Sequence, residues 1–221
     1  MTAASAASAV SGRGPRPASA GLRRVHAQIL RQLALMAELA RGPEAELAAR
    51  VPAVSGWSVA EQLEHLVLVD RAVLKSVLRI LDDPHGRSAQ AAQPEQLAQP
   101  AQPAQPGINL LGRVVLGIGF IPRGRARTLP PFQPGAPPAA AAGAGVVGIV
   151  GIAEIERGMR QLEPRLGDLE ASGSRSRHPL FGGLGGRQWL RFVTVHHHHH
   201  LKIVRDIRRA RGLATAGLPS R

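Results

Sequence analysis

Five consecutive histidines, His196 to His200, are the residues whose types and spacing most clearly suggest chemistry. If this segment is helical, residues four apart lie on one face, close enough to hold the same ion. Only one such pair exists within the run, namely His196 and His200. Neutral imidazole is the commonest metal ligand in proteins. The run therefore has three interpretations: a metal site, a purification tag, or a solvated polar face of a helix.

The sequence around the run argues against a purification tag. Tags usually lie at a terminus, whereas here apolar residues continue in helical phase on both sides. Trp189 and Phe192 precede the histidines, and Ile203 and Ile207 follow them. These positions follow the alternation of three and four residues that is typical of a buried helical stripe. We therefore expect an amphipathic helix over residues 187–211 with the run in its middle.

This helical phase gives the five histidines different surroundings. It turns His196 and His200, or His199 in place of His200, toward the protein interior, while His197 and His198 point away. Inward histidines can also be core residues that are satisfied by hydrogen bonds to neighbours. Because two of them occur at ligand spacing, the pattern favours the metal site.

A catalytic zinc-type site uses three protein ligands and one open position, so a third ligand is needed. The chain has no cysteine, which leaves histidines and carboxylates. His65 is the strongest candidate, because it lies in the middle of a second predicted helix among apolar residues. His26 lies on the first predicted helix and could also face inward, whereas His85 and His178 fall in predicted loops.

Apolar periodicity predicts an all-α protein that folds as a four-helix bundle. The four long helices are expected over residues 21–41, 58–81, 146–169 and 187–211. Ser58 and Glu61 have the spacing of a capping box at the start of the second helix. Pro164 predicts a kink or an early end of the third. No strand pattern is evident.

The remaining segments are rich in proline, glutamine, alanine and glycine. Residues 1–20 are expected to form a disordered tail and residues 212–221 a flexible one, on either side of a bundle domain at 21–211. A long Pro/Gln/Ala-rich insertion, about residues 83–145, separates the second and third helices. It includes a Gln-Pro repeat and a short apolar segment, 108–121, that is expected to form one short helix.

The chain is strongly basic, with a formal net charge of +13 from 28 Lys and Arg against 15 Asp and Glu. Such a charge can indicate nucleic acid or anionic membrane as partner. The arginines are dispersed without interleaved aromatic residues, so we do not expect nucleic-acid binding. Residues 1–20 lack the apolar core of a signal peptide, and the longest apolar stretch, 139–153, is too short to span a bilayer. We therefore expect a cytoplasmic protein without a membrane partner.

Two segments of the chain resemble the DinB-like superfamily. The stretch Trp57-Ser-Val-Ala-Glu-Gln-Leu-Glu-His65-Leu is similar to the opening of its second helix, where a Trp-Ser pair precedes a ligand histidine by this spacing. The run His196 to His200 is similar to its His-x-x-His-His motif. Residues 178–182 and 188–193 also resemble one uncharacterised branch. The resemblance covers about residues 21–82 and 146–211.

The resemblance implies a divalent metal ion (Zn, Ni or Fe) held by His65, His196 and His200. Relatives with this triad are described as metal-dependent hydrolases or as transferases of low-molecular-weight thiols. It therefore implies a thiol cosubstrate and an electrophilic small molecule as partners, in a protein that can pair as a homodimer. One departure is Ile203, where many relatives carry a glutamine that could support the last ligand.

Other residues near these motifs are candidates for substrate contacts. Arg187, Arg191, Arg24 or Arg71 could bind the carboxylate of a thiol, although each can equally be a solvated surface arginine. Glu61 and Glu64, within about a turn of the candidate ligand on the second helix, could act as a base. The alternative is a non-catalytic bundle that binds a metal or a partner.

Overall fold

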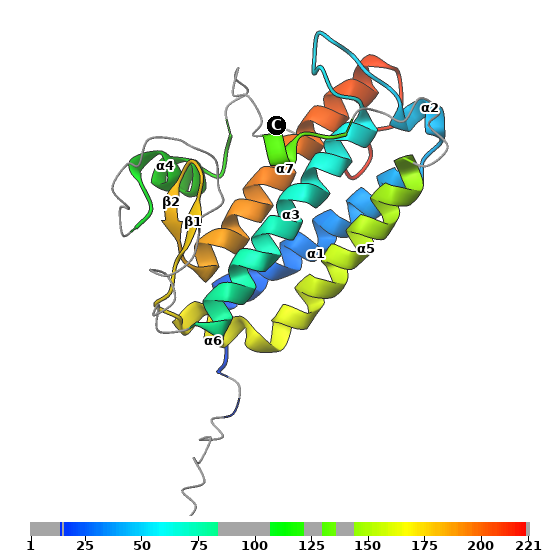
Figure 1. Ribbon diagram of the computed structural model, residues 1–221. Coiled ribbons are helices and arrows are strands. Elements are labelled where there is room, and N and C mark those ends of the chain that lie inside the picture. The colour runs from blue at the N-terminus through cyan, green and yellow to red at the C-terminus, as the bar shows by residue number, and fades with distance from the viewer. Residues whose placement is uncertain (1–13, 15, 84–106, 122–129, 136–143, 220–221) are drawn as a thin grey trace, which may run out of the picture.

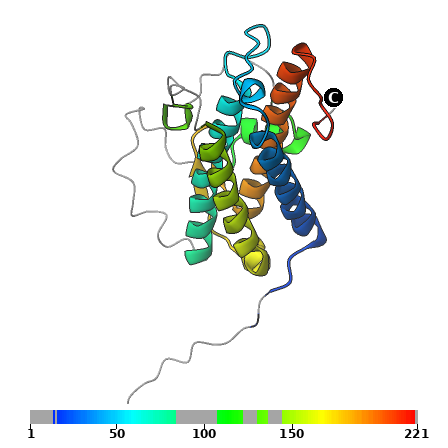
Figure 2. The same ribbon diagram turned by 90° about the vertical axis from the view of Figure 1, so that its right-hand side faces the viewer.

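A computed structural model describes residue 14 and residues 16–83, 107–121, 130–135 and 144–219. Four long helices dominate it, as Figure 1 shows: α1 (Ala20–Ala40), α3 (Val59–Asp82), α5 (Ala144–Leu162) and α7 (Gly186–Ala210). Helices α1 and α3 each pack against both α5 and α7, so the four surround one apolar core (Figure 2). The expectation of an all-α bundle is confirmed.

The direction of the helices explains why so long a segment separates α3 from α5. Gly151 and Gly158 of α5 approach Val67 and Leu74 of α3, and since both numbers rise together, these neighbouring helices run parallel. The chain must therefore travel back along the bundle between them. For the 24 residues of α3 this distance is about 36 Å at 1.5 Å per residue. The connection that we expected as an insertion is a crossover that the topology requires.

Glycine in α5 allows the two parallel helices to approach closely. A Cβ atom added to Gly151 would lie 2.7 Å from Val67 Cγ1, and one added to Gly158 would lie 2.9 Å from Leu74 Cδ1. Both distances are shorter than van der Waals contact. The two glycines therefore face α3, and this accounts for the Gly-interrupted sequence of an otherwise apolar helix.

The predicted helix boundaries are largely as the caps and breakers indicate. Ser58 accepts a hydrogen bond from Glu61 N, and Glu61 Oε2 accepts one from Ser58 N, which confirms the capping box. Pro164 ends the third helix early. A 3₁₀ turn, η3 (Glu163–Arg165), separates α5 from the short α6 (Leu166–Ala171). A further short helix, α2 (Glu44–Leu47), follows α1.

Beside the bundle lies a small layer built from the crossover and from the segment before α7. It contains α4 (Leu110–Ile118) and the antiparallel strands β1 (Ser176–His178) and β2 (Gly182–Leu184), as Figure 1 shows. No strand was expected from the sequence, and this is wrong for the two strands of the hairpin. Strands of three residues are too short to show an alternating pattern. Further along the crossover, the short 3₁₀ helix η2 (Pro130–Phe132) contacts α3.

The core is largely the one that the apolar periodicity predicts. In α3 the apolar residues at helical spacing are all buried, namely Val59, Leu63, Leu66, Val69, Val73, Val77 and Ile80. In α5 the same periodicity includes Val150, which is 61% exposed. Beyond α7, in the segment expected to be part of a flexible tail, Leu218 is buried and Pro219 O accepts a hydrogen bond from Arg205. Among the described helices, none is long and apolar enough to cross a bilayer. The Gln-Pro repeat and most of the N-terminal tail lie outside the described residues.

Candidate metal centre

Three histidines that are far apart in the sequence come together in the core. His65 projects from α3, and His196 and His200 project from the facing side of α7, one turn apart. One ring nitrogen from each lies within 4.8 Å of the others. All three side chains are buried, with exposed fractions of 5%, 9% and 8%. The antiparallel packing of α3 against α7 thus assembles the three candidates that the sequence singled out.

Hydrogen bonds fix which nitrogen of two of these rings is free. His65 Nδ1 lies 2.7 Å from Phe132 O, and His200 Nδ1 lies 2.6 Å from Gln62 Oε1. Both partners are oxygen acceptors, so each Nδ1 carries the proton and donates it. In a neutral imidazole the other nitrogen, Nε2, then has an unprotonated lone pair. Metal-binding histidines are commonly oriented in this way.

The third ring supplies the sharpest test of whether a metal fits. His196 Nε2 lies 3.3 Å from His65 Nε2, and His196 Nδ1 is buried without a hydrogen-bond partner. With Zn–N distances of about 2.05 Å, two ligands of a tetrahedral ion lie about 3.3 Å apart. The separation of these two nitrogens therefore matches the edge of a coordination tetrahedron. The donor set fits a divalent ion of the zinc, nickel or iron type.

The surroundings of the triad keep its rings neutral. Burial lowers the pKa of His196 and of His200 well below the usual value, and neighbouring histidines lower both further. Burial also lowers the pKa of His65, against the opposing effects of the Phe132 carbonyl and the Asp70 charge. Neutral imidazole is the form that binds a metal. Because the triad contains no carboxylate, a bound ion would keep its full charge toward a fourth ligand.

Aromatic side chains form part of the wall of the site. The ring of Trp57 lies 5.1 Å from that of His65 and 6.5 Å from that of His200. Phe192 stacks on His196 with the ring centres 5.2 Å apart. Such a wall limits water and lowers the local dielectric, which strengthens electrostatic interactions inside the site.

Residues 28–204 match the sequence profile of the DinB superfamily. The chain belongs to the DinB superfamily. The match includes two of the four long helices in full, α3 and α5, most of α1 and α7, and all three histidines of the triad. No curated protein and no solved structure matches the chain. The match establishes the superfamily to which the chain belongs and does not identify a reaction.

The other histidines of the run in this DinB-superfamily chain differ partly from expectation. His197 does not point away: it is fully buried, and its Nε2 lies 2.7 Å from the carboxylate of Asp70, which is also fully buried. The helical phase predicted only one buried face for this helix. Because α7 contacts several helices, more than one face is buried, and His197 lies on the second. His198 is partly exposed, and His199 Nδ1 lies 3.0 Å from Ile121 O.

Neither His26 nor His178 joins the triad. His26 is buried as expected, but its Nε2 lies 2.8 Å from Met159 O on α5. His178, expected in a loop, lies in β1, where its Nδ1 accepts hydrogen bonds from Leu180 N and Phe181 N. Burial lowers the pKa of His178 to about 4. His85 lies outside the described residues.

The acidic residues near the triad have structural partners. Glu61 completes the capping box and pairs with Arg50 at 2.6 Å, and Glu64 accepts a hydrogen bond from Gly135 N. The structure therefore gives neither one the place of a base beside the triad. A polar group that sequence reasoning missed is Gln62, whose amide oxygen contacts His200. This residue supplies from α3 the polar contact that Ile203 cannot supply from α7.

Three of the arginines considered as carboxylate ligands are also engaged elsewhere. Arg71 pairs with Glu154 at 2.6 Å. Arg187 lies 3.9 Å from a carboxylate oxygen of Glu170, and Arg191 donates to Leu116 O. Arg24 is exposed on α1.

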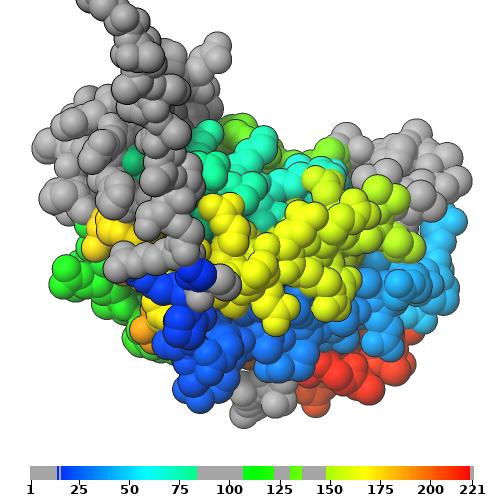
Figure 3. Space-filling model, turned by 90° about the horizontal axis from the view of Figure 1, so that it is seen from below, coloured from blue at the N-terminus to red at the C-terminus, as the bar shows by residue number. Residues whose placement is uncertain are grey.

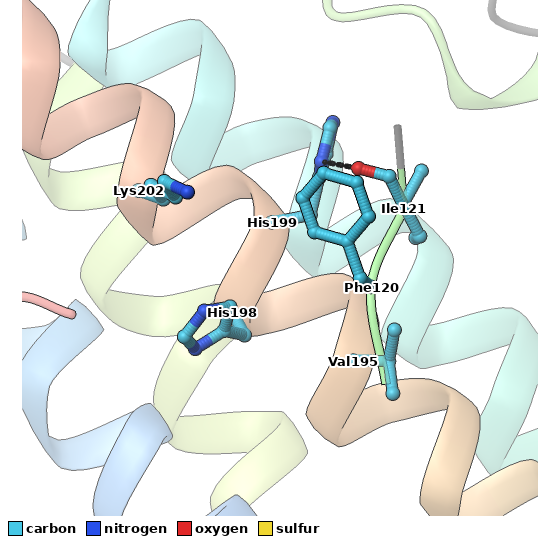
Figure 4. A pocket seen from close by; sticks show the side chains of 6 residues that line it. All are labelled: Phe120, Ile121, Val195, His198, His199 and Lys202. Carbon is cyan, nitrogen blue, oxygen red and sulfur yellow. Dashed lines mark hydrogen bonds between the residues drawn. The ribbon is translucent and has the colours of Figure 1, made fainter. Parts of the chain in front are cut away.

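Basic and polar groups instead line a groove of about 200 Å³ beside the triad, shown in Figure 4. Val195, His198, His199 and Lys202 of α7 form one side, and Phe120 and Ile121 after α4 form the other. The ring of His199, which lines the groove, lies 5.0 Å from that of His200 in the triad. Partial burial and the charges of Lys202 and Arg205 lower the pKa of His198. The groove combines an apolar wall with positive potential.

Proposed function

We propose that this protein binds a divalent metal ion through His65, His196 and His200, and that it acts as a metal-dependent S-transferase of a low-molecular-weight thiol or as a hydrolase. The observation that carries the proposal is the pair of Nε2 atoms of His65 and His196, 3.3 Å apart in a buried site. At that distance the two nitrogens either share one proton in an N–H···N hydrogen bond or bind one cation. A metal ion satisfies all three rings.

When bound, such an ion lowers the pKa of water or of a thiol and polarises an electrophile. The residues of the chain have distinct parts in this chemistry. Phe132 O and Gln62 Oε1 hold the rings of His65 and His200 in the tautomer that binds the ion. Trp57 and Phe192 limit water around the rings. Because the chain has no cysteine, the sulfur of a transferase reaction has to come from the cosubstrate.

The groove lined by His198 and Lys202 supports a small, partly apolar and negatively charged cosubstrate. Lys202 Nζ lies 5.8 Å from the centre of the Phe120 ring, so positive charge and apolar surface are adjacent there. A thiol that carries a carboxylate would match both features. Three of the four arginines that were candidates for this contact are paired elsewhere, which leaves Lys202 as the better placed cation.

One observation favours a second function, in which the bundle binds a metal without catalysis. No histidine of the triad is more than 9% exposed, and the two nearby glutamates, Glu61 and Glu64, are engaged in structural contacts. The burial of the site and the lack of a free carboxylate at either of these two positions are features of a structural centre, whereas the count of three ligands is that of a catalytic one.

Metal analysis of tag-free protein tests the site, and the pentahistidine run provides its own control. We expect one equivalent of metal in the wild type and in His198→Ala, and none in His65→Ala, His196→Ala or His200→Ala. Trp57 contacts two of the rings, so addition of Ni²⁺ to the metal-free protein should also quench the fluorescence of Trp57. This is measured in Trp189→Phe, in which Trp57 is the remaining tryptophan. If His198→Ala loses the metal as completely as His200→Ala, the run binds metal as a tag would, and the triad is not a site.

Turnover separates the two functions. The metal-loaded protein is incubated with a thiol and an electrophilic substrate, or with an ester or amide substrate, and products are measured. Turnover that depends on added metal and is lost in both His65→Ala and His200→Ala supports the enzyme. A stoichiometric metal without turnover over a broad panel favours the non-catalytic bundle, and absence of metal under all loading conditions refutes both.

A further inference from the structure

The short helix α4 exposes a row of large aliphatic side chains. Leu110 is 77% exposed, Leu111 54%, Val114 46% and Ile118 72%. Leu180, in the turn between β1 and β2, is 55% exposed and lies beside them, because its carbonyl accepts a hydrogen bond from Asn109 at the start of α4. We call these five residues the aliphatic patch. Contiguous exposed apolar surface of this kind is uncommon in monomeric proteins and marks interaction sites.

The patch is held in place by contacts on the opposite side of α4. Val115 and Leu116 on that side are buried in the core. Asn109 N donates to Phe181 O of the hairpin, and Leu116 O accepts a hydrogen bond from Arg191 of α7. The helix therefore cannot turn its aliphatic side inward without losing these contacts. In the space-filling view from below, α4 lies at an edge of the molecule, beyond α1 and α5 (Figure 3).

The charged side chains of α4 and of the hairpin have one sign. After Glu95 the next acidic residue is Glu154, and after Glu170 the next is Asp206, so neither α4 nor the hairpin carries a negative side chain. The arginines beside the patch, Arg113 on α4 and Arg175 and Arg177 before or within β1, are exposed. This face of the molecule is therefore apolar at its centre and positively charged around it.

We propose that α4 and the β1–β2 hairpin form a docking surface for an anionic lipid bilayer. The aliphatic patch would enter the boundary between headgroups and acyl chains, while the arginines pair with lipid phosphates. Such attachment needs neither a spanning helix nor a signal peptide, and the lack of these two features was the ground for expecting no membrane partner. A second copy fits this face less well, since two like-charged faces repel. Nucleic acid fits less well because aliphatic side chains do not stack on bases.

Sedimentation with vesicles tests the proposal on the full chain. Vesicles of phosphatidylcholine alone and mixed with phosphatidylglycerol are compared at low and high salt, with EDTA present so that the metal site has no influence. We expect binding to the anionic vesicles that weakens with salt. The double substitution Leu110→Ser/Ile118→Ser should lower the partition coefficient at least tenfold, a rough expectation from the apolar area removed from the interface.

A matched control is the double substitution Leu78→Ser/Val150→Ser, which removes exposed aliphatic side chains from α3 and α5 instead. It should bind vesicles like the wild type, and both variants should keep the wild-type circular dichroism and melting temperature. The proposal is overturned if the anionic vesicles do not bind the protein, or if both double variants lose binding equally. It is also overturned if Leu110→Ser/Ile118→Ser binds vesicles as the wild type does. A change only from dimer to monomer in this variant would identify the patch as a contact between two copies and would likewise overturn the proposal, as would a loss of binding to a DNA duplex without a loss of binding to vesicles.

Discussion

Replacing Gln62 by leucine should weaken metal binding without changing any of the three candidate ligands. Gln62 is 1% exposed. Its Oε1 accepts a hydrogen bond from His200 Nδ1 at 2.6 Å, and its Nε2 donates one to Ser55 Oγ at 2.9 Å. Leucine has a similar volume but no acceptor. The substitution therefore removes the group that selects the tautomer of His200 while leaving the packing between α3 and α7 nearly intact.

The size of the effect follows from the hydrogen bond that is lost. Without Gln62, the metal-binding tautomer of His200 leaves a buried Nδ1–H unpaired, which costs about 1–3 kcal/mol. The metal-free protein can avoid this cost by moving the proton to Nε2, but the metal-bound protein cannot. At 1.4 kcal/mol for each factor of ten, the Kd should rise about 5- to 150-fold. This range includes the roughly 10- to 100-fold loss that is typical when an outer contact of a ligand histidine is removed.

The assay is a competition titration of the metal-free protein against a chromophoric chelator, with Zn²⁺ and Ni²⁺ in turn. Trp57 fluorescence gives an independent reading of the same equilibrium, because its ring lies near His65 and His200. Urea unfolding of each metal-free variant shows whether it is folded. A change in Kd counts only for a variant that is folded before metal is added.

The control is Gln32→Leu. Gln32 is likewise buried, at 9% exposure, but it lies on α1 and donates to Thr194 O rather than to a histidine of the triad. We expect it to lower stability without changing the Kd. If folded Gln62→Leu binds metal with the wild-type Kd, or if both variants weaken binding equally, the assignment of Gln62 as the residue that orients His200 is refuted.

Two further predictions concern buried polar groups. Asp70→Ala removes the partner of the buried His197 Nε2 and should lower the free energy of unfolding by about 1–3 kcal/mol. Asp70→Leu/His197→Leu, which removes both polar groups, should recover most of this loss. An unchanged free energy of unfolding in Asp70→Ala would contradict the pairing. The pKa of His178 falls to about 4 on folding, so between pH 6.5 and 4 the unfolded chain binds a proton that the folded chain lacks. The free energy of unfolding should therefore fall as the pH is lowered through this window. His178→Asn keeps a hydrogen-bond acceptor but cannot take up the proton, so it should reduce the slope of the free energy of unfolding against pH by at most about 1.4 kcal/mol per pH unit. Urea titrations with EDTA measure both effects, and an unchanged slope in His178→Asn would contradict the second.

Local patterns in the sequence were sufficient for the helices and for the ligand candidates. The capping box at Ser58 and the apolar stripes fixed where helices begin and which faces are buried, since both depend on neighbours within a turn or two. The spacing of His196 and His200 belongs to the same class of information. His65 needed a further argument, because its relation to the other two depends on how two helices pack.

Other features depend on which helices are neighbours, and the sequence carries no local signal for that. His197 was expected to be exposed because a single stripe was counted, but the contacts of α7 with both α1 and α3 bury more than one face. The parallel course of α3 and α5 decided that a long crossover is required and where Gly151 and Gly158 must lie. The sequence did not predict the hairpin of β1 and β2, because its strands are too short to show an alternating pattern of apolar and polar residues.

The sequence by itself thus determined the fold class, the helices and three candidate ligands. Tertiary structure decided the site: it brought the three rings within 4.8 Å of one another, and gave His65 the carbonyl of Phe132 and His200 the amide of Gln62. It also paired Asp70 with His197 and left one side of α4 exposed. The physical reason is that helix periodicity arises from bonds between near neighbours, whereas tautomer, burial and exposed surface are set by groups that only packing brings together.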